Sequence, residues 1–216
     1  VVDPADLATA ETGRAGGATA HGHGALEAGI GEQPLAQRPA IAQADRGPWP
    51  SAIWQAVDDA GLPLALVAES HGSAVLGAAS CLRLIRRSAY YTLPVPLAES
   101  MIASALWAQA EGEIPSGALS LAPCNASDRV RLERVGDRYA LSGTLRRVPW
   151  AAQVGHILLH AQDADAAPFI VMLPAGRATT QPLYNLAGEP RDTLTVDGVT
   201  LPASAVRPAP SRAAGG

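Results

Sequence analysis

The apolar residues of this chain change their spacing near Pro115. Before Pro115 they recur every three or four positions, which predicts helices from about 50 to 60, from about 75 to 91 and from about 96 to 112. After it they fall in short segments bounded by turn residues, which is typical of strands. Because helices precede strands without alternating, we predict an α+β fold with an N-terminal helical part followed by a part rich in strands.

The second half of the chain contains several strand segments and two dipeptides that are typical of hairpin turns. These dipeptides are Gly136-Asp137 and Asp197-Gly198, and the second is among the strongest short hairpin signals. We therefore expect the chain to reverse direction at both places. The expected strands are 118–122, 130–135, 139–142, 157–161, 169–173, 193–196 and 199–201.

Changes in composition divide the chain into four parts. We expect a weakly structured arm over 1–47, because this part is rich in Ala and Gly and has few large apolar residues. The helical domain is expected over 48–114, the middle β domain over 115–207 and a tail over 208–216. His21 and His23 lie in the arm, and two histidines alone do not form a metal site, so we assign no metal ligands.

Charge and hydrophobicity exclude several classes of protein. The net charge of −4 and the dispersion of the 16 basic residues, all arginine, argue against nucleic-acid binding. Cys81 and Cys124 are far apart, which argues against a zinc knuckle or a disulfide scaffold. Without an apolar run of about 20 residues or a signal-peptide pattern, we expect no membrane association and a cytoplasmic location.

Three sequence segments, in a fixed order, carry a family resemblance. They are DDAGLPLALVAESHGS at 58–73, SLAPCNASD at 120–128 and YALSGTLRRVPWA at 139–151. In this order they resemble the acyl-CoA dehydrogenases, and 194–206 is similar to the closing strands of that family's middle domain. The V-P-W-A variant resembles the divergent, often heteromeric branch associated with steroid and other bulky acyl-CoA substrates. The resemblance covers about 50–206 and implies an N-terminal helical domain followed by an antiparallel β-barrel-like middle domain. It also implies an oxidoreductase of lipid or steroid catabolism.

The matches are partial at the positions where the family binds its flavin. In the first segment Glu69 and Gly72 match a Pro-Glu-x-x-Gly-Gly pattern. In the second, Ser127 and Asp128 match Thr-Glu-Pro-x-x-Gly-Ser-Asp, while the threonine and glutamate positions hold other residues. In the third, a proline stands at the threonine position of the family's Trp-Ile-Thr-Asn turn. Those three departures are Leu121, Ala122 and Pro149, and Arg147 takes the tryptophan position.

The resemblance implies FAD as cofactor and an acyl-CoA thioester as substrate, with α,β-dehydrogenation as the reaction. Ser127 is expected to offer its hydroxyl to the flavin pyrophosphate, and Trp150 is a candidate to stack on the isoalloxazine. An ordinary turn at Ser127 and a tryptophan buried between sheet and helices are the alternatives. The cofactor-binding positions that we carry over are Leu121, Ala122, Ser127, Pro149 and Trp150.

In the resembling family the catalytic base is a glutamate on a C-terminal helical bundle. The sequence ends ten residues after Val206, where that bundle would begin, so we expect the bundle to be absent. Glu99, Glu111 and Glu113 match no catalytic position, and we assign no catalytic residue. The resemblance thus implies a fragment or subunit of a dehydrogenase, which associates with itself or with a dehydrogenase subunit.

Other functions remain open from the sequence. A non-catalytic structural subunit of a heteromeric dehydrogenase is the main alternative, and an acyl-CoA or apolar-ligand binding module is a weaker one. The glycines at 22–29 are not preceded by a strand, so they do not form a dinucleotide-binding motif. A hydrolase lacks support, because no Gly-x-Ser-x-Gly motif is present. His156 and His160 share a strand face and are interpreted as structural.

Overall fold

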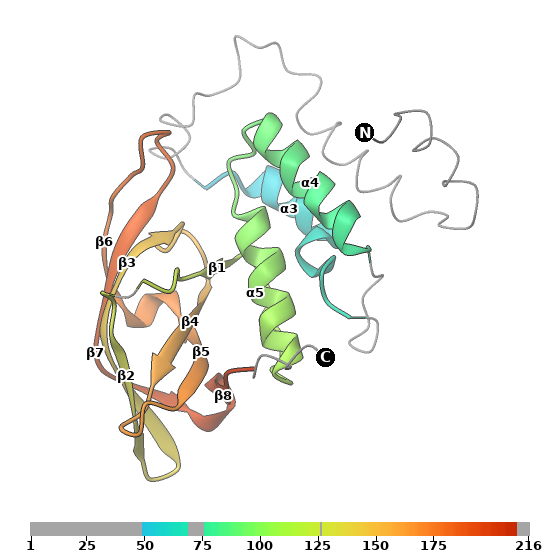
Figure 1. Cartoon of the computed structure of the whole chain (residues 1–216). Helices are drawn as coiled ribbons and strands as arrows, with labels where there is room; N and C mark the ends of the chain where they lie inside the picture. Colours follow the sequence, from blue (N-terminus) through green and yellow to red (C-terminus); the bar gives the residue numbers. More distant parts are fainter. Residues whose placement is uncertain (1–48, 69–75, 126, 211–216) are drawn as a thin grey trace, which may run out of the picture.

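A computed structural model describes residues 49–68, 76–125 and 127–210 of the chain. The arm predicted over 1–47, with His21 and His23, lies outside the described residues, as do Glu69 and Gly72. Within these described ranges, three helices lie on one side of a curved sheet, and α5 is the one next to the sheet (Figure 1). They are α3 (Ser51–Asp59), α4 (Ala78–Tyr90) and α5 (Leu97–Gln109), with a short 3-10 turn, η3 (Leu62–Leu64), after α3.

The predicted α+β architecture is confirmed, with one mostly antiparallel sheet of eight strands in the part of the chain that the structure describes. The strand order is β6-β7-β3-β2-β4-β5-β8, and β1 pairs with β4 beside this path. The pairings of β4 with β1 and with β2 are parallel, which the prediction did not include. The strands are β1 (Leu119–Leu121), β2 (Val130–Val135), β3 (Arg138–Pro149), β4 (His156–Gln162), β5 (Pro168–Pro174), β6 (Thr179–Gln181), β7 (Arg191–Pro202) and β8 (Val206–Pro208).

One of the two predicted hairpin turns is confirmed and the other is wrong. Gly136, with φ +64°, turns β2 into β3, and Val135 pairs with Arg138. Asp197-Gly198 forms no turn: β7 runs through it and pairs with β3 on both sides. The dipeptide instead forms a bulge, in which the Gly198 N–H donates to the Ser142 hydroxyl at 2.9 Å. Strand β3 is long enough to pair with β7 on both sides of the dipeptide, so β7 continues without reversing direction. The bulge accommodates the positive φ of Gly198.

Helix α5 is the centre of the helical layer and is buried on more than one face. Leu97 and Met101 belong to the main core cluster, which joins the helices to the sheet. Ala103 and Trp107 belong to a second cluster with Leu119 of β1. A helix apolar on several faces is expected where it packs between two layers. Within the described ranges, each helix is too short or too polar to cross a bilayer.

Candidate functional site

A groove of about 480 Å3 opens between the first turns of α5 and the ends of β1 and β3. This volume lies in the range of small-molecule sites. We call Ala98, Glu99 and Ile102 the helix wall, and Leu121, Pro123 and Pro149 the strand wall. The remaining lining residues are Asn125 after β1, Arg147 in β3, Asn185 in the loop between β6 and β7, and Arg191 at the start of β7. The site is therefore assembled from four separate segments of the chain.

Ser100 fixes the helix wall against the strand wall. Its side chain is fully buried, and its hydroxyl donates to the Leu119 carbonyl at 2.9 Å and accepts from the Leu119 N–H at 3.0 Å. Both backbone groups of Leu119 that face the helix are thereby satisfied. Because Glu99 precedes Ser100 directly, this contact sets the position of Glu99 relative to the end of β1.

The end of β3 has an irregular backbone where it lines the groove. The pairing of β3 with β7 shifts register between Leu145 and Val148, and Arg147 within this bulge has φ +59°. A bulge redirects side chains locally, and here Arg147 reaches the groove. The Ser120 hydroxyl of β1 donates to the Pro149 carbonyl. Pro149 is therefore held to β1 as part of the strand wall.

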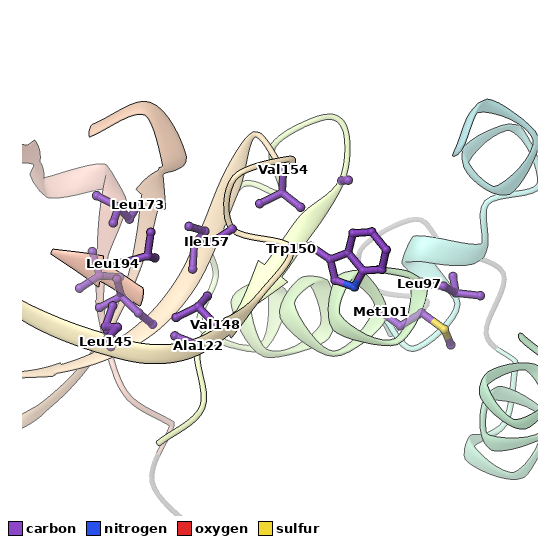
Figure 2. Packing of buried hydrophobic residues seen from close by; sticks show 14 of the residues in the cluster. Leu97, Met101, Ala122, Leu145, Val148, Trp150, Val154, Ile157, Leu173 and Leu194 are labelled. Atoms are coloured by element: carbon purple, nitrogen blue, oxygen red, sulfur yellow. The ribbon is translucent and has the colours of Figure 1, made fainter. Parts of the chain in front are cut away.

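Trp150 lies beneath the groove instead of lining it. The residue has φ +53° and is 5% exposed, and its ring belongs to the main core cluster. Figure 2 shows Trp150 pointing from the end of β3 towards Leu97 and Met101 of α5. The ring thus fills space between the sheet and the helical layer, which is the alternative that we gave for this residue.

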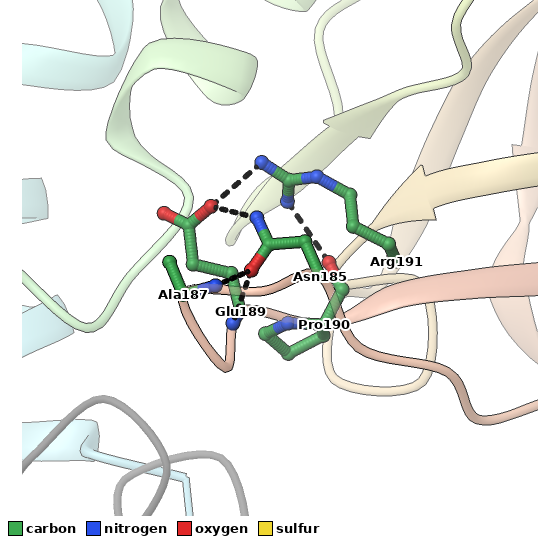
Figure 3. Close-up of polar contacts among 5 residues, drawn as sticks. All are labelled: Asn185, Ala187, Glu189, Pro190 and Arg191. Carbon is green, nitrogen blue, oxygen red and sulfur yellow. Dashed lines mark hydrogen bonds and ion pairs between the residues drawn. The ribbon is translucent and has the colours of Figure 1, made fainter.

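The loop between β6 and β7 closes one end of the groove through a network around Asn185 (Figure 3). The Asn185 side-chain carbonyl accepts from the N–H groups of Ala187 and Glu189, each at 2.9 Å. Its amide donates to the Glu189 carboxylate at 2.7 Å, and Arg191 donates to the same carboxylate at 2.9 Å. A second Arg191 nitrogen donates to the Pro190 carbonyl at 2.9 Å. The loop and the start of β7 are thus one hydrogen-bonded unit.

Asp192 joins this loop to the turn after β3. Asp192 is 2% exposed, and its carboxylate accepts from the N–H groups of Ala152 at 3.0 Å and Leu183 at 3.3 Å. Burial raises the pKa of Asp192, and these hydrogen bonds offset the rise only in part. Two loops that are far apart in the sequence are thereby held at the groove by one buried side chain.

Glu99 is the carboxylate on the helix wall, and it is half-buried. Burial raises the pKa of Glu99, and the nearby Glu189 adds to this, while its own backbone N–H and Arg191 act in the opposite direction. The net rise means that the groove disfavours the charged form and favours a carboxyl that carries its proton. A protonated carboxyl both donates and accepts hydrogen bonds.

A second, more polar pocket of about 330 Å3 adjoins the groove and shares Pro123 and Asn125 with it. Asp128 braces this side: its carboxylate accepts from the Arg146 guanidinium at 2.7 Å and from the Arg146 N–H at 2.8 Å. Asn125 donates to the same carboxylate at 3.0 Å. The other residues lining the pocket are Cys124, Arg129, Leu145, His160 and Gln162.

The structure brings only part of the predicted cofactor-binding set together. Leu121 and Pro149 both line the groove, as part of the strand wall. Ala122 is buried, and its N–H donates to the Leu158 carbonyl at 2.9 Å, so it is already engaged in the sheet. Ser127 is exposed in the loop between β1 and β2, and Trp150 is in the core. Cofactor binding at all five positions stays a prediction.

Sequence reasoning missed Glu99, Asn185 and Arg191 as groove residues. Glu99 was considered only as a catalytic base, and nothing in the helical spacing shows that α5 packs with this turn against β1. Asn185 and Arg191 flank a loop whose sequence matches no motif that we recognised. The one available signal was the Asn-x-x-x-Glu-x-Arg arrangement over 185–191, in which short polar side chains bond to nearby backbone groups.

Comparison with known proteins identifies the fold. No protein-family model matches the chain, and no curated protein matches it. Among solved structures, a variant of the Tcur3481–Tcur3483 steroid ACAD superposes with a TM-score of 0.68 at 21% identity, over 87% of this chain. The ChsE4–ChsE5 complex from Mycobacterium tuberculosis superposes with a TM-score of 0.69 at 17% identity, over 91% of this chain. A glutaryl-CoA dehydrogenase from Mycobacterium smegmatis in complex with FADH2 gives 0.66 at 16% identity, over 89%.

The chain spans 56–58% of the length of these three solved chains. At identities of 16–21% the similarity concerns the fold, and activity has to be argued from the site. The helical layer, the mostly antiparallel sheet and the order in which they follow one another agree with the resemblance found in the sequence. The described part of the chain therefore has the fold of the acyl-CoA dehydrogenases.

Proposed function

We propose that the chain forms the flavin-binding part of an acyl-CoA dehydrogenase-like flavoprotein that catalyses α,β-dehydrogenation of an acyl-CoA thioester. The observation that supports this most is the groove between α5 and the ends of β1 and β3. Its strand wall contains Leu121 and Pro149, two of the positions at which the sequence resemblance implies flavin contacts. The complex of the glutaryl-CoA dehydrogenase neighbour with FADH2 is consistent with this proposal.

The residues of the groove fit a flavin ring. Leu121, Pro123 and Pro149 offer an apolar surface for the face of a flat ring system, and Arg147 and Asn185 offer donors for its polar edge. When bound, FAD supplies the acceptor for the hydride that leaves the β-carbon. The chain itself would position the ring through the strand wall and keep water from its face. We assign no described residue as the base that removes the α-proton.

The test is flavin binding by the purified chain, followed by its visible absorbance and by quenching of flavin fluorescence on titration. We expect FAD to bind, and Leu121→Arg to weaken binding by tenfold or more, because it places a charge on the apolar wall. Leu186→Arg is the matched control, since Leu186 is fully exposed and outside the groove. Absence of FAD binding, or equal loss in both variants, contradicts the proposal.

One observation favours the alternative of a non-catalytic structural subunit. Pro149 has no N–H, and the Ala122 N–H is engaged by Leu158, so two of the predicted flavin positions lack an available backbone donor. Two of the solved neighbours are named as two-component assemblies, which is consistent with a partner subunit. Co-purification decides between the readings: a dehydrogenase-like partner recovered with a flavin-free chain supports the structural subunit.

A further inference from the structure

A pocket of about 490 Å3 opens beside the second half of α5, and it shares no lining residue with the groove. We call it the Ser104 pocket, after the residue that α5 contributes. The other lining residues are Asp58 of α3, Pro63 and Leu64 of η3, and the loop over 112–117 that leads to β1. Its volume lies in the range of small-molecule sites, and the site already described does not use it.

Ser104 gives this pocket a buried hydroxyl that has no hydrogen-bond partner among the described residues. The residue is 1% exposed and lies one helical turn after Ser100, on the same face of α5. The two serines differ, because the Ser100 hydroxyl donates to and accepts from Leu119. Burial of a hydroxyl without a partner costs free energy. A ligand that reaches Ser104 from the pocket would recover this cost through one hydrogen bond.

One wall of the pocket is fixed by Trp107. The Trp107 indole N–H donates to the Glu113 carbonyl, and the Gly112 N–H donates to the Trp107 carbonyl, each at 2.9 Å. A side chain at position 112 would collide with the Trp107 ring, so the loop lies directly against this ring. The backbone at Glu113 is therefore preorganised, and a preorganised wall binds a ligand without the cost of ordering the loop.

The charged groups around the pocket are acidic. Asp58 and Glu113 are exposed, and no arginine is among the described residues that line the pocket. This charge disfavours the phosphates of FAD and of acyl-CoA, and it favours a cation. Pro63, Leu64 and Ile114 add apolar surface for the body of a ligand.

We infer that the Ser104 pocket is a second ligand site, which binds a small organic cation with an apolar body and a hydroxyl at its far end. The hydroxyl of the ligand bonds to Ser104, and its body packs on Pro63 and Leu64. Its cationic group lies near the carboxylates of Asp58 and Glu113. This site does not depend on the proposed function, because its ligand is opposite in charge to FAD and acyl-CoA.

The test is titration of the full chain with tyramine, which carries a phenol hydroxyl, an aromatic ring and an ammonium group. Two-dimensional NMR spectra follow the backbone amides, and we expect the largest shifts at Gly112, Glu113 and Gly117. Two analogues separate the contributions of the polar groups. We expect 2-phenylethylamine, which lacks the hydroxyl, to bind roughly three- to tenfold more weakly than tyramine. We expect 3-(4-hydroxyphenyl)propanoate, in which a carboxylate replaces the ammonium, to bind at least about tenfold more weakly.

Two substitutions assign these preferences to residues. Ser104→Ala should abolish the preference for tyramine over 2-phenylethylamine and leave the affinity for 2-phenylethylamine unchanged, since it breaks no hydrogen bond of the free protein. Glu113→Gln should weaken the binding of both amines by roughly two- to fivefold, because its charge is exposed to solvent. Glu111→Gln is the matched control, since Glu111 is equally exposed but lies outside the pocket.

The outcomes distinguish this site from the proposed function. Amide shifts that centre on the groove, or that vanish when FAD is added, would show that tyramine does not use the Ser104 pocket. Equal binding of the carboxylate analogue, or a hydroxyl preference that survives Ser104→Ala, would also overturn the second site. If FAD does not bind but tyramine binds with the expected preferences, the proposed function is wrong and the second site is supported.

Discussion

Two aspartates, the half-buried Asp128 and the buried Asp192, each hold loops beside the groove, but in different ways. Asp128 is paired with a cation: Arg146 contacts it through both its guanidinium and its N–H. Asp192 relies on the backbone N–H groups of Ala152 and Leu183. The Asp128 side chain is 2% exposed although the residue as a whole is only half-buried, whereas Asp192 is buried as a whole residue.

The partners determine the direction in which each pKa moves. Burial alone would raise the pKa of Asp128, but hydrogen bonds from Asn125 and Arg146 and the charge of Arg146 lower it overall. Burial also raises the pKa of Asp192, and there the backbone N–H groups do not reverse the effect. Asp192, which has no cationic partner among the described residues, thus joins two loops by hydrogen bonds in surroundings that disfavour its charged form. It serves as a structural acceptor more than as an ionic partner.

The largest expected loss of stability follows from substitution of Asp192. Asp192→Ala removes a buried carboxyl group and leaves two part-buried N–H groups, those of Ala152 and Leu183, without their acceptor. We expect the free energy of unfolding to fall by about 2–3 kcal/mol, since each donor that loses its partner costs about 1–3 kcal/mol and water replaces part of the loss at these part-buried groups. Urea denaturation measures this. A loss below about 0.5 kcal/mol would show that these loops do not depend on Asp192.

Asp128→Ala should lower the free energy of unfolding by less, about 1–2 kcal/mol, although Asp128 accepts more hydrogen bonds than Asp192. The reason is that the Arg146 side chain is 53% exposed, so water replaces Asp128 around the freed guanidinium. Denaturation in urea under the same conditions gives the comparison. If Asp128→Ala proves more destabilising than Asp192→Ala, the ion pair matters more than its exposure suggests.

Opposite pKa shifts predict opposite pH dependence. Asp128 has a folded-state pKa below the ordinary 3.8, so its stabilisation is present above that pH and is lost as the pH falls through the folded pKa. Asp192 has a raised pKa, so its contribution is greatest below 3.8 and declines as the pH rises through the folded pKa. Melting temperatures of Asp128→Asn and Asp192→Asn between about pH 3 and pH 7 should therefore differ from wild type in opposite directions with pH. Parallel curves would contradict the assignment.

The smallest expected change in stability follows from substitution of Glu99. Unlike Asp128 and Asp192, this third carboxyl group neither pairs with a bonded cation nor joins two loops. Its raised pKa means that ionisation costs stability as the pH rises above the ordinary 4.5. We expect Glu99→Gln to raise the melting temperature by about 1–3 °C at pH 7 and to have no effect well below pH 4.5. Differential scanning calorimetry measures the shift, with Glu133→Gln as the exposed control. A lower melting temperature at pH 7 would show that the charged form is stabilised.

Much of the fold could be predicted because its signals are local. The three described helices and strands β1, β2, β4 and β5 were expected near their observed positions, since apolar spacing reflects which face is buried. Strand β3 was expected only over 139–142 but continues to Pro149, and β6 and β8 were not expected. The prediction failed at Asp197-Gly198, where the dipeptide suits both a tight turn and a bulge. The dipeptide forms a bulge because β7 pairs with the long strand β3 on both sides of it. The sequence around the dipeptide does not show that this pairing will form.

The candidate site was predictable only in part, because a groove belongs to segments that meet in space. Leu121 and Pro149 were found through motifs on the strands that carry them, and both line the groove. Trp150 was found in the same way, but it packs into the core, since its left-handed backbone turns the ring beneath the strand. Motif spacing identifies the segment and does not determine which side of it a residue faces.

The sequence by itself determined the order of helices and strands, the turn at Gly136 and the resemblance to one dehydrogenase fold. These depend on backbone sterics and on hydrophobic spacing within short stretches of chain. Only the tertiary structure decided that Ser100 bonds Leu119, that Asp192 joins two loops, and that Glu99 faces an apolar groove. Such contacts form when the chain closes on itself, and their free energy depends on partners and burial that spacing along the sequence does not encode.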